Sequence, residues 1–257
     1  MKYKVVNLLF FVIFIIVLVL IYQSILPIIS LIYLLLLYLA VTFAGATIVR
    51  WNYFFEAYHH NKSTLKNEVS ITFDDGPTAN TLEILNILDR FDAKATFFCI
   101  GHKIDERPEV FKAIIAKGHT VANHTYSHPK NYGFLSTKTV VNEIESCNLA
   151  IKNHSGLISK LYRTPFGNAN PKIKRALQKT GLTPIGWSIR SFDTLISSKK
   201  IILKRVTSRV KKGDIILLHD SQMHTNVILE QLLLFLKNKN LKSVTVDQLL
   251  NLKAYED

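Results

Sequence analysis

The N-terminal part of the chain lacks charge. No Asp, Glu, Lys or Arg occurs between Lys4 and Arg50. A secretory signal needs an apolar core of only about 7–15 residues, whereas one membrane-spanning helix needs about 20. The uncharged run is too long for a simple signal peptide and is long enough for two spans.

Polar residues divide this run near its middle. Gln23 and Pro27 mark the natural break. We therefore expect a transmembrane region over residues 1–49 with two helices, at about 5–22 and 27–49, in an integral protein of the bacterial plasma membrane. The alternative is one long anchor with an interfacial extension.

Cysteine is also scarce. The chain has two, Cys99 and Cys147, and neither belongs to a Cys-x-x-Cys pair. This excludes redox and zinc motifs that are built on paired cysteines. Cys99 lies within the apolar run "ATFFCI", so we expect it to be buried.

Acidic residues are outnumbered, 19 against 32 Lys and Arg, and the net charge is +13. Lys2 and Lys4 are the only charged residues of the segment 1–49, so residues 50–257 carry +11 of this charge. The basic residues are scattered and no nucleic-acid-binding motif is present, which argues against a nucleic-acid partner. A basic domain beside a membrane instead suits anionic lipid headgroups or an anionic polymer.

Residues 50–68 are aromatic and then polar, and we interpret them as a linker that leaves the membrane. Trp51, Tyr53, Phe54 and Phe55 fit an aromatic belt at the membrane interface.

Beyond this linker, strand-like and helix-like stretches alternate. Short apolar runs indicate strands, and runs opened by Ser or Pro and closed by Gly indicate helices. The expected strands are 69–74, 95–100, 120–123, 161–163, 184–189, 214–218 and 242–246, and the expected helices are 81–91, 108–117, 136–153, 171–180, 199–211 and 226–237. This alternation predicts an α/β domain over residues 69–257 with about seven parallel strands, either a closed or nearly closed barrel or an open doubly wound sheet.

Titratable side chains recur where the predicted strands end. In chain order they are Asp74 and Asp75, His124 and His128, Arg163, Asp193, and finally His219 and Asp220. Because the carboxyl ends of parallel strands lie at one rim, we expect these side chains to meet there.

A metal site is the most specific interpretation of the residues at this rim. His124 and His128 are four residues apart, and an aspartate from another strand end completes a three-ligand site with one face open to water. Imidazole and carboxylate ligands suit zinc, with cobalt, nickel or iron as further candidates.

Four segments, "TFDDGP", "HTYSH", "RTPFG" and "ILLHD", occur in this order and resemble the motifs of the polysaccharide deacetylases (carbohydrate esterase family 4, with the NodB-homology domain). The resemblance covers about residues 69–250. It implies a distorted (β/α) barrel and the metal-dependent removal of N- or O-acetyl groups from sugars.

The resemblance also implies a role for each matching residue. Asp74 would be the general base and would be held by Arg163. His219 would be the general acid, and Asp193 would pair with the far side of the catalytic machinery. The metal ligands would be Asp75, His124 and His128.

Elementary chemistry supports these roles independently. Amide hydrolysis needs a base for the attacking water and an acid for the leaving amine, which Asp74 and His219 can supply. The backbone N–H of Phe166 is a candidate oxyanion donor, since Pro165 has none. Leu217 alternates with His219 on one strand face, so it is a candidate wall for the acetyl pocket.

Three positions depart from the family pattern. Thr164 stands where the family often has proline, Phe166 where it has tyrosine, and Thr194 where a tryptophan often follows the aspartate. Trp187 is the nearest tryptophan to Thr194. Loss of the tyrosine hydroxyl matters little if the backbone N–H of Phe166 is the donor. The absence of tryptophan after Asp193 concerns the pocket wall and therefore the substrate.

Other readings stay open at this point. They are a hydrolase of cyclic amides or imides on the same scaffold, an inactive glycan-binding relative, and an iron oxygenase. Asp220 either orients His219 or caps the next helix. Lys2 and Lys4 favour a cytoplasmic N-terminus. Two spans would then place the domain inside, beside a lipid-linked sugar, and one span would place it outside, beside a mature glycan.

Overall fold

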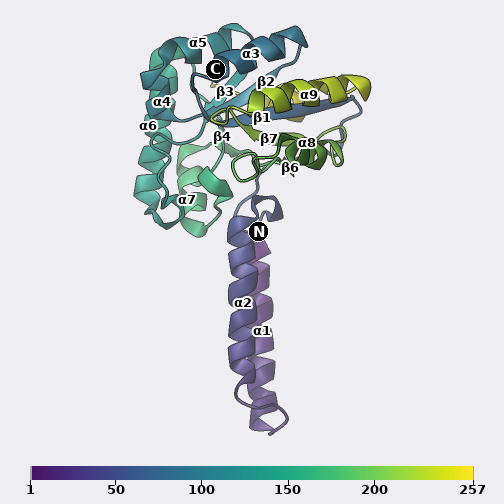
Figure 1. The fold of residues 1–257 in the computed structure, drawn as a ribbon. Coiled ribbons are helices and arrows are strands. Elements are labelled where there is room, and N and C mark those ends of the chain that lie inside the picture. The colour runs from purple at the N-terminus through teal and green to yellow at the C-terminus, as the bar shows by residue number, and fades with distance from the viewer. Residues whose placement is uncertain (1, 257) are drawn as a thin grey trace.

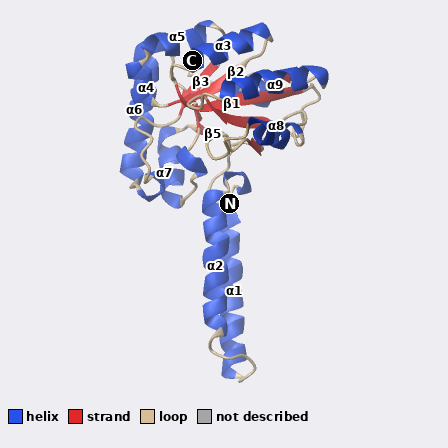
Figure 2. Ribbon diagram, in the orientation of Figure 1, coloured by secondary structure: helices blue, strands red, loops and turns tan. Residues whose placement is uncertain are grey.

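The computed structural model describes residues 2–256 and shows two long helices attached to an α/β domain (Figure 1, Figure 2). Helices α1 (Lys2–Tyr22) and α2 (Ser30–Thr47) lie side by side, and their connecting turn is at the end farthest from the domain. The two predicted helices are confirmed. Helix α1 begins earlier than predicted, and α2 is shorter at both ends.

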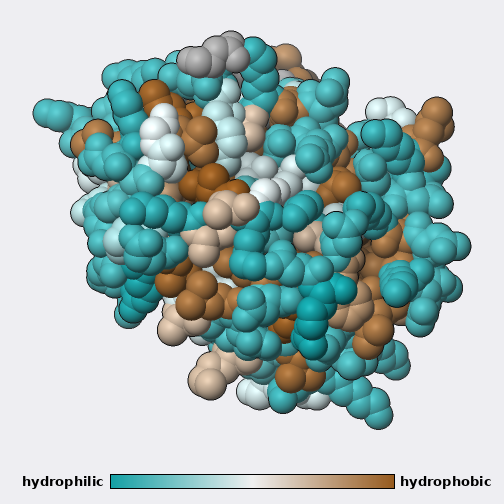
Figure 3. Space-filling view, turned by 90° about the horizontal axis from the view of Figure 1, so that it is seen from above, coloured by the Kyte–Doolittle hydropathy of each residue, from teal (hydrophilic) through white to brown (hydrophobic). Residues whose placement is uncertain are grey.

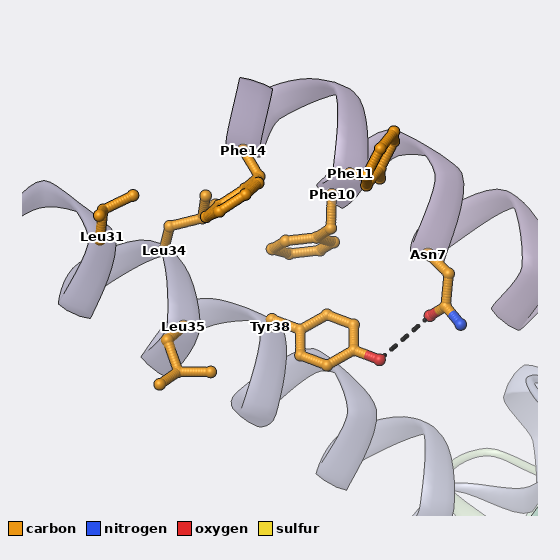
Figure 4. Close-up of a pocket in the computed structure, with 8 residues that line it drawn as sticks. All are labelled: Asn7, Phe10, Phe11, Phe14, Leu31, Leu34, Leu35 and Tyr38. Carbon is orange, nitrogen blue, oxygen red and sulfur yellow. Dashed lines mark hydrogen bonds between the residues drawn. The ribbon is translucent and has the colours of Figure 1, made fainter. Parts of the chain in front are cut away.

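This helical hairpin exposes apolar side chains along its length. Residues 2–22 include no buried side chain, and within α2 only Gly45 is buried. Between the helices, Phe10 meets Tyr38 edge-on with ring centroids 5.2 Å apart, and the Tyr38 hydroxyl donates to Asn7 Oδ1 over 3.2 Å (Figure 4). Both helices are long and apolar enough to cross a membrane.

The domain is built on one curled parallel sheet. Its strands are β1 (Glu68–Gly76), β2 (Ala95–Cys99), β3 (Thr120–Asn123), β4 (Leu161–Tyr162), β5 (Thr183–Pro184), β6 (Ile189–Arg190), β7 (Ile215–His219) and β8 (Lys242–Ser243). The order along the sheet is β5-β4-β3-β2-β1-β7-β6, and β8 pairs with β1. This is the strand order of a barrel, but within residues 2–256 β5 and β6 do not pair. The predicted parallel α/β fold is confirmed as an open half-barrel of seven strands, with the short eighth strand β8 beside β1 and off this path.

Eight α-helices cover the sheet. They are α3 (Thr81–Arg90), α4 (Gly101–Glu106), α5 (Pro108–Ala116), α6 (Thr137–Ser155), α7 (Pro171–Thr180), α8 (Lys199–Thr207), α9 (Thr225–Asn238) and α10 (Val246–Leu250). The caps follow the sequence signals, because Ser136 accepts from Thr139 N–H at the start of α6 and Gly181 adopts a left-handed conformation after α7. Every residue of β2 and β7 is buried, as is expected for strands covered on both faces.

Two predicted strands are wrong in detail. The strand expected at 184–189 is two separate pairs of residues, β5 and β6, because the chain leaves one edge of the open barrel and joins the other. The last strand ends at Ser243, since helix α10 already begins at Val246. The short helix α4 was not anticipated.

The segment after α2 is packed rather than loose. Tyr53, Phe54 and Phe55 are 4%, 6% and 8% exposed, so their assignment to a membrane-interface belt is wrong. They belong to a cluster that includes Tyr132 and Ile173 of the domain. Trp51, earlier in the same segment, is 41% exposed.

The same segment also runs into the gap between the two free sheet edges. Tyr58 N–H donates to Pro184 O and Gly186 N–H donates to Tyr58 O, over 3.0 and 2.7 Å. His60 then pairs with Asp214 at 2.9 Å. Residues 58–60 therefore connect the free edge at β5 to the residue that precedes β7.

The domain face that points away from the hairpin differs from the helices. Seen from above, it is mainly hydrophilic, with scattered apolar side chains (Figure 3). Most of the exposed large apolar side chains thus lie on α1 and α2.

Candidate active site

The strand ends bring the predicted residues together as expected. Asp74 of β1 lies beside His219 of β7 in the parallel register. One cavity of about 290 Å³ is lined by both residues and by the following neighbours: Asp75, His124, His128, Phe166 and Leu217. Arg163 and Asp193 lie behind this lining and contact Asp74 and His219.

A distortion of β1 explains how two adjacent aspartates can both serve one site. Successive side chains of a regular strand point to opposite faces. Here the pairing with β2 shifts between Asp74 and Gly76, and Asp75 has a φ of 72°. Such a bulge redirects a side chain. It lets Asp75 line the same cavity as Asp74.

Asp75, His124 and His128 form a compact cluster. The Nε2 atoms of both histidines lie 3.6 Å from Asp75 Oδ1. One ligand atom from each of the three residues lies within 4.8 Å of the others. His128, with a φ of 49°, is held in an unfavourable backbone conformation, as is common at functional sites.

The surroundings of the cluster fit a divalent metal ion. His124 Nδ1 donates to the carbonyl of Arg163 over 2.9 Å, which leaves the Nε2 lone pair directed towards Asp75. Burial opposes the charge on Asp75, but the hydrogen bond and charge of His124 outweigh it and hold the Asp75 pKa well below its usual range. Burial and the nearby His124 lower the pKa of His128 to about 4, so it is neutral and able to act as a ligand near pH 7.

Asp74 is held by a buried arginine. Arg163 Nη1 donates to Asp74 Oδ1 over 2.7 Å and to Thr72 Oγ1 over 2.8 Å. Its other guanidinium nitrogens donate to the carbonyls of Ile185 and Gly186, over 3.2 and 2.9 Å. Burial lowers the pKa of Arg163, against the opposing effect of Asp74. Arg163 thus fixes Asp74 and also bridges to the chain between β5 and β6.

His219 is held from the other side of the cavity. Its Nδ1 lies 2.8 Å from Asp193 Oδ1, and its backbone N–H donates to Asp193 Oδ2 over 2.7 Å. Ser191 Oγ also donates to Asp193, over 2.7 Å. Burial alone would lower the pKa of His219, but the hydrogen bond and charge of Asp193 outweigh it and raise this pKa.

The wall of the cavity contains residues that the motifs did not identify. Trp187, Arg190 and Leu195 line it together with Phe166 and Leu217. Trp187 supplies the aromatic wall that the motif comparison placed after Asp193. Arg190 lies in the same stretch, "GWSIRSFDT", but a lone arginine gave no periodic or motif signal.

Phe166 occupies a strained turn at the cavity. Its φ is 59°, and half of its surface is exposed. The centroids of the Phe166 and His128 rings lie 4.7 Å apart. Within residues 2–256, the backbone N–H of Phe166 donates no hydrogen bond. Gly167, with a φ of 73°, follows because an added Cβ would lie 2.9 Å from Trp187.

Asp220 performs neither of the two roles that the sequence suggested. Its Oδ2 accepts from Thr81 Oγ1 over 2.6 Å, and its carbonyl accepts from Thr78 and Asn80. Burial raises the pKa of Asp220 to about 7. It fixes the start of α3 against β7, and Gly76 leaves room for it, since a Cβ there would lie 2.1 Å from Asp220 Oδ2.

Fold and site together define an α/β half-barrel with a candidate metal centre at the carboxyl ends of its strands. Residues 61–185 match the family model described as polysaccharide deacetylase. The peptidoglycan-N-acetylglucosamine deacetylase PgdA of Listeria monocytogenes is 32% identical over 189 residues, which cover 73% of this chain and 40% of that protein. The chain therefore spans about 40% of the length of this relative.

Two further relatives are matched over almost their whole length. A peptidoglycan-N-acetylglucosamine deacetylase of Bacillus cereus is 30% identical, over 72% of this chain and 89% of that protein. The solved structure of a family 4 carbohydrate esterase from Streptomyces lividans, in complex with acetate, has a TM-score of 0.65 at 33% identity and covers 68% of this chain and 91% of that one. This chain belongs to the polysaccharide deacetylase family.

Proposed function

We propose that this protein is a metal-dependent hydrolase that removes N-acetyl, or O-acetyl, groups from a glycan or a lipid-linked sugar. The observation that carries the proposal is the arrangement around one cavity. A two-histidine, one-carboxylate cluster lies between a carboxylate held by Arg163 and an imidazole held by Asp193. These are the groups that amide hydrolysis needs.

Asp74 and His219 divide the proton transfers. Asp74 takes a proton from the attacking water, and its Oδ2, which is not the oxygen bound by Arg163, lies 3.9 Å from His124 Nε2. The water oxygen bonds to the acetyl carbon. His219 then gives its proton to the leaving nitrogen, the carbon–nitrogen bond breaks, and acetate and a free amine result.

Asp75, His124 and His128 would hold the metal ion, for which zinc is the first candidate. When bound, such an ion lowers the pKa of water and polarises the acetyl oxygen. The backbone N–H of Phe166 assists by donating to the developing oxyanion. Leu217 and Trp187 limit the room for the acyl group.

Acetate release tests this function directly. The full chain, purified in detergent and loaded with zinc, is incubated with N-acetylglucosamine oligomers, and acetate and free amine are measured together. Equal amounts of both products support the proposal. Absence of acetate with every metal, but turnover of cyclic imides, would select the alternative hydrolase. Glycan binding without any turnover would select the inactive relative.

We further propose that α1 and α2 cross the membrane, with the domain on the cytoplasmic side. Lys2, Lys4 and Arg50 all lie at the domain end of the hairpin, and short flanks rich in such residues stay inside. The hairpin is also fixed to the domain, because Ala169 N–H donates to Ala46 O over 2.8 Å. A cleavable leader would not be expected to make this contact.

Labelling with a membrane-impermeant thiol reagent tests this topology. Leu65, which is 90% exposed, and Gln23, in the turn of the hairpin, are each changed to cysteine. Native Cys99 and Cys147 are buried, so they give little background. In intact cells Gln23→Cys should react and Leu65→Cys should not. The reverse result would place the domain outside, and reaction at both sites would contradict two spans.

A further inference from the structure

A second cavity adjoins the catalytic pocket where α2 meets the domain. It has a volume of about 200 Å³ and is lined by residues 47–50 at the end of α2, by residues 187–190 and Phe192, and by two arginines of the α8 region. Trp187 and Arg190 line both this cavity and the catalytic pocket. The two cavities are therefore direct neighbours that share these two side chains.

The charge of this cavity is entirely positive. Four arginines line it, Arg50, Arg190, Arg205 and Arg209, and its lining contains no acidic residue. None of the ion pairs found within residues 2–256 involves these arginines. Burial, followed by the charges of Arg209 and Arg190, lowers the pKa of Arg205. Arg205 is thus repelled by its neighbours, and an anion would relieve that repulsion. Burial lowers the pKa of Arg190 as well, and the charges of Asp74 and Asp193 oppose this effect.

Two of the arginines are held in place with donors to spare. Arg190 and Arg205 both pack on the Phe192 ring, with their guanidinium carbons 4.8 and 4.3 Å from its centroid. Arg205 Nε donates to Arg190 O over 2.9 Å. Arg190 Nε is buried without a hydrogen-bond partner in the part of the chain that the structure describes. Guanidinium groups fixed in this way match the oxygens of a phosphate.

The location of this cavity limits which phosphate-bearing compounds are expected to bind in it. Thr47 ends α2, the second apolar helix, and Arg50 follows within one turn, so the cavity opens where the hairpin leaves its proposed lipid phase. A phosphate carried by a lipid would be concentrated at this boundary. A sugar joined to a lipid through phosphate would place its phosphoryl group here and its sugar in the catalytic pocket.

We infer that the arginine-lined cavity binds the phosphate or diphosphate group of a lipid-linked amino sugar, and that this sugar is the substrate. The inference rests on the proposed deacetylase function and names its substrate class. The same phosphoryl chemistry occurs in anionic phospholipid headgroups, so an experiment has to separate the two sources.

Two substrates with the same alkyl chain separate them. One is N-acetylglucosamine joined to the chain through a diphosphate, and the other is the neutral alkyl N-acetylglucosaminide. Both are offered in neutral detergent to the zinc-loaded full chain, and kcat/KM for acetate release is measured. We expect the diphosphate compound to be preferred, and Arg205→Gln and Arg209→Gln each to reduce that preference roughly 10- to 100-fold, the value of a charge-assisted hydrogen bond.

Arg90→Gln is the matched control, because it removes the same charge from the far end of α3, where Arg90 pairs with exposed Glu230. It should leave the preference unchanged. An equal loss on both substrates in the Arg205 and Arg209 variants would overturn the inference. So would a wild-type enzyme without preference.

Two further outcomes are distinguishable. If no acetate is released from either substrate, the proposed function fails, and the cavity is then tested alone by binding of the alkyl diphosphate without sugar. Loss of that binding in Arg209→Gln but not in Arg90→Gln would keep the anion site. If the Arg209 variant loses only binding to phosphatidylglycerol vesicles, the cavity is a headgroup site and the substrate assignment is wrong.

Discussion

Asp74 and Asp193 are both buried carboxylates at the catalytic pocket, but they are paired with different cations. Asp74 contacts Arg163, whose charge is permanent in proteins. Asp193 contacts His219, whose imidazole can gain or lose a proton and whose pKa Asp193 raises. Each pair has nearly the same length, 2.7 and 2.8 Å, so geometry alone does not distinguish them.

The difference shows how one type of contact can serve two purposes. In the proposed mechanism the carboxylate of the first pair carries out the chemistry and the cation supports it, so the support must not lose its charge. In the second pair the proposed mechanism gives the chemistry to the imidazole and the supporting role to the carboxylate, so the imidazole must be able to lose a proton. We therefore expect Asp74 to act as the base and His219 as the acid.

The strongest test separates Asp74 from its neighbour Asp75. Asp75→Asn should lose bound metal and all measurable turnover. Asp74→Asn should keep the metal and lose about 10²–10⁴-fold in kcat, the usual value of a positioned base. Metal content by elemental analysis, measured beside acetate release, checks both. Metal loss in the Asp74 variant with retention in the Asp75 variant would reverse the two roles.

Folding has to be measured in the same experiment. Asp74→Asn leaves the buried Arg163 without a countercharge, and breaking such a pair costs about 3–5 kcal/mol. A thermal unfolding curve therefore accompanies each variant. An Asp74 variant that is folded and metal-bound but inactive is the informative result.

His219→Ala gives the next largest effect. We expect kcat to fall by about 10²–10⁴-fold with metal retained, because the leaving nitrogen loses its proton donor. The alkaline limb of the pH–rate profile should also disappear, since that limb reports deprotonation of His219. A profile of unchanged shape in this variant would rule out the acid role.

Much of this site could be predicted from the sequence, because strand ends are easy to recognise. The run "ILLH" ends a buried strand at His219, and "VAN" before His124 ends another. Parallel strands then bring such residues to one rim without further information. This rule and the motifs were enough to predict where the candidate metal ligands and the two supporting residues, Arg163 and Asp193, lie.

Other features depend on contacts that leave no local pattern. The bulge at Asp75 is a property of the backbone between two strands. Tyr53, Phe54 and Phe55 have the composition of an interfacial belt, and only their contacts with residues such as Tyr132 show that they are core. Trp187 and Arg190 reach the pocket because the barrel stays open between β5 and β6.

Asp193→Asn should have a smaller effect than removing His219 itself. Loss of a supporting partner typically costs about 10- to 100-fold. The contact between Asp193 and His219 determines the direction in which the pH–rate profile should move. Asp193 raises the pKa of His219, so its removal lowers that pKa, and the alkaline limb of the kcat profile should move to lower pH. A reduced kcat with an unshifted limb would mean that Asp193 only holds the backbone of His219.

The smallest effect is expected from Leu217, which belongs to neither pair. It is 2% exposed and lines the pocket two residues before His219. Leu217→Ala should enlarge the acyl site, so the ratio of kcat/KM for N-propionyl over N-acetyl substrate should rise by roughly 10-fold, the lower range for one methylene. Leu217→Ile, which keeps the volume, is the control and should leave the ratio near that of the wild type. If the alanine variant lowers kcat/KM equally for both substrates, Leu217 supports His219 rather than the acyl group, and the pocket wall must be assigned to Trp187 and Leu195 instead.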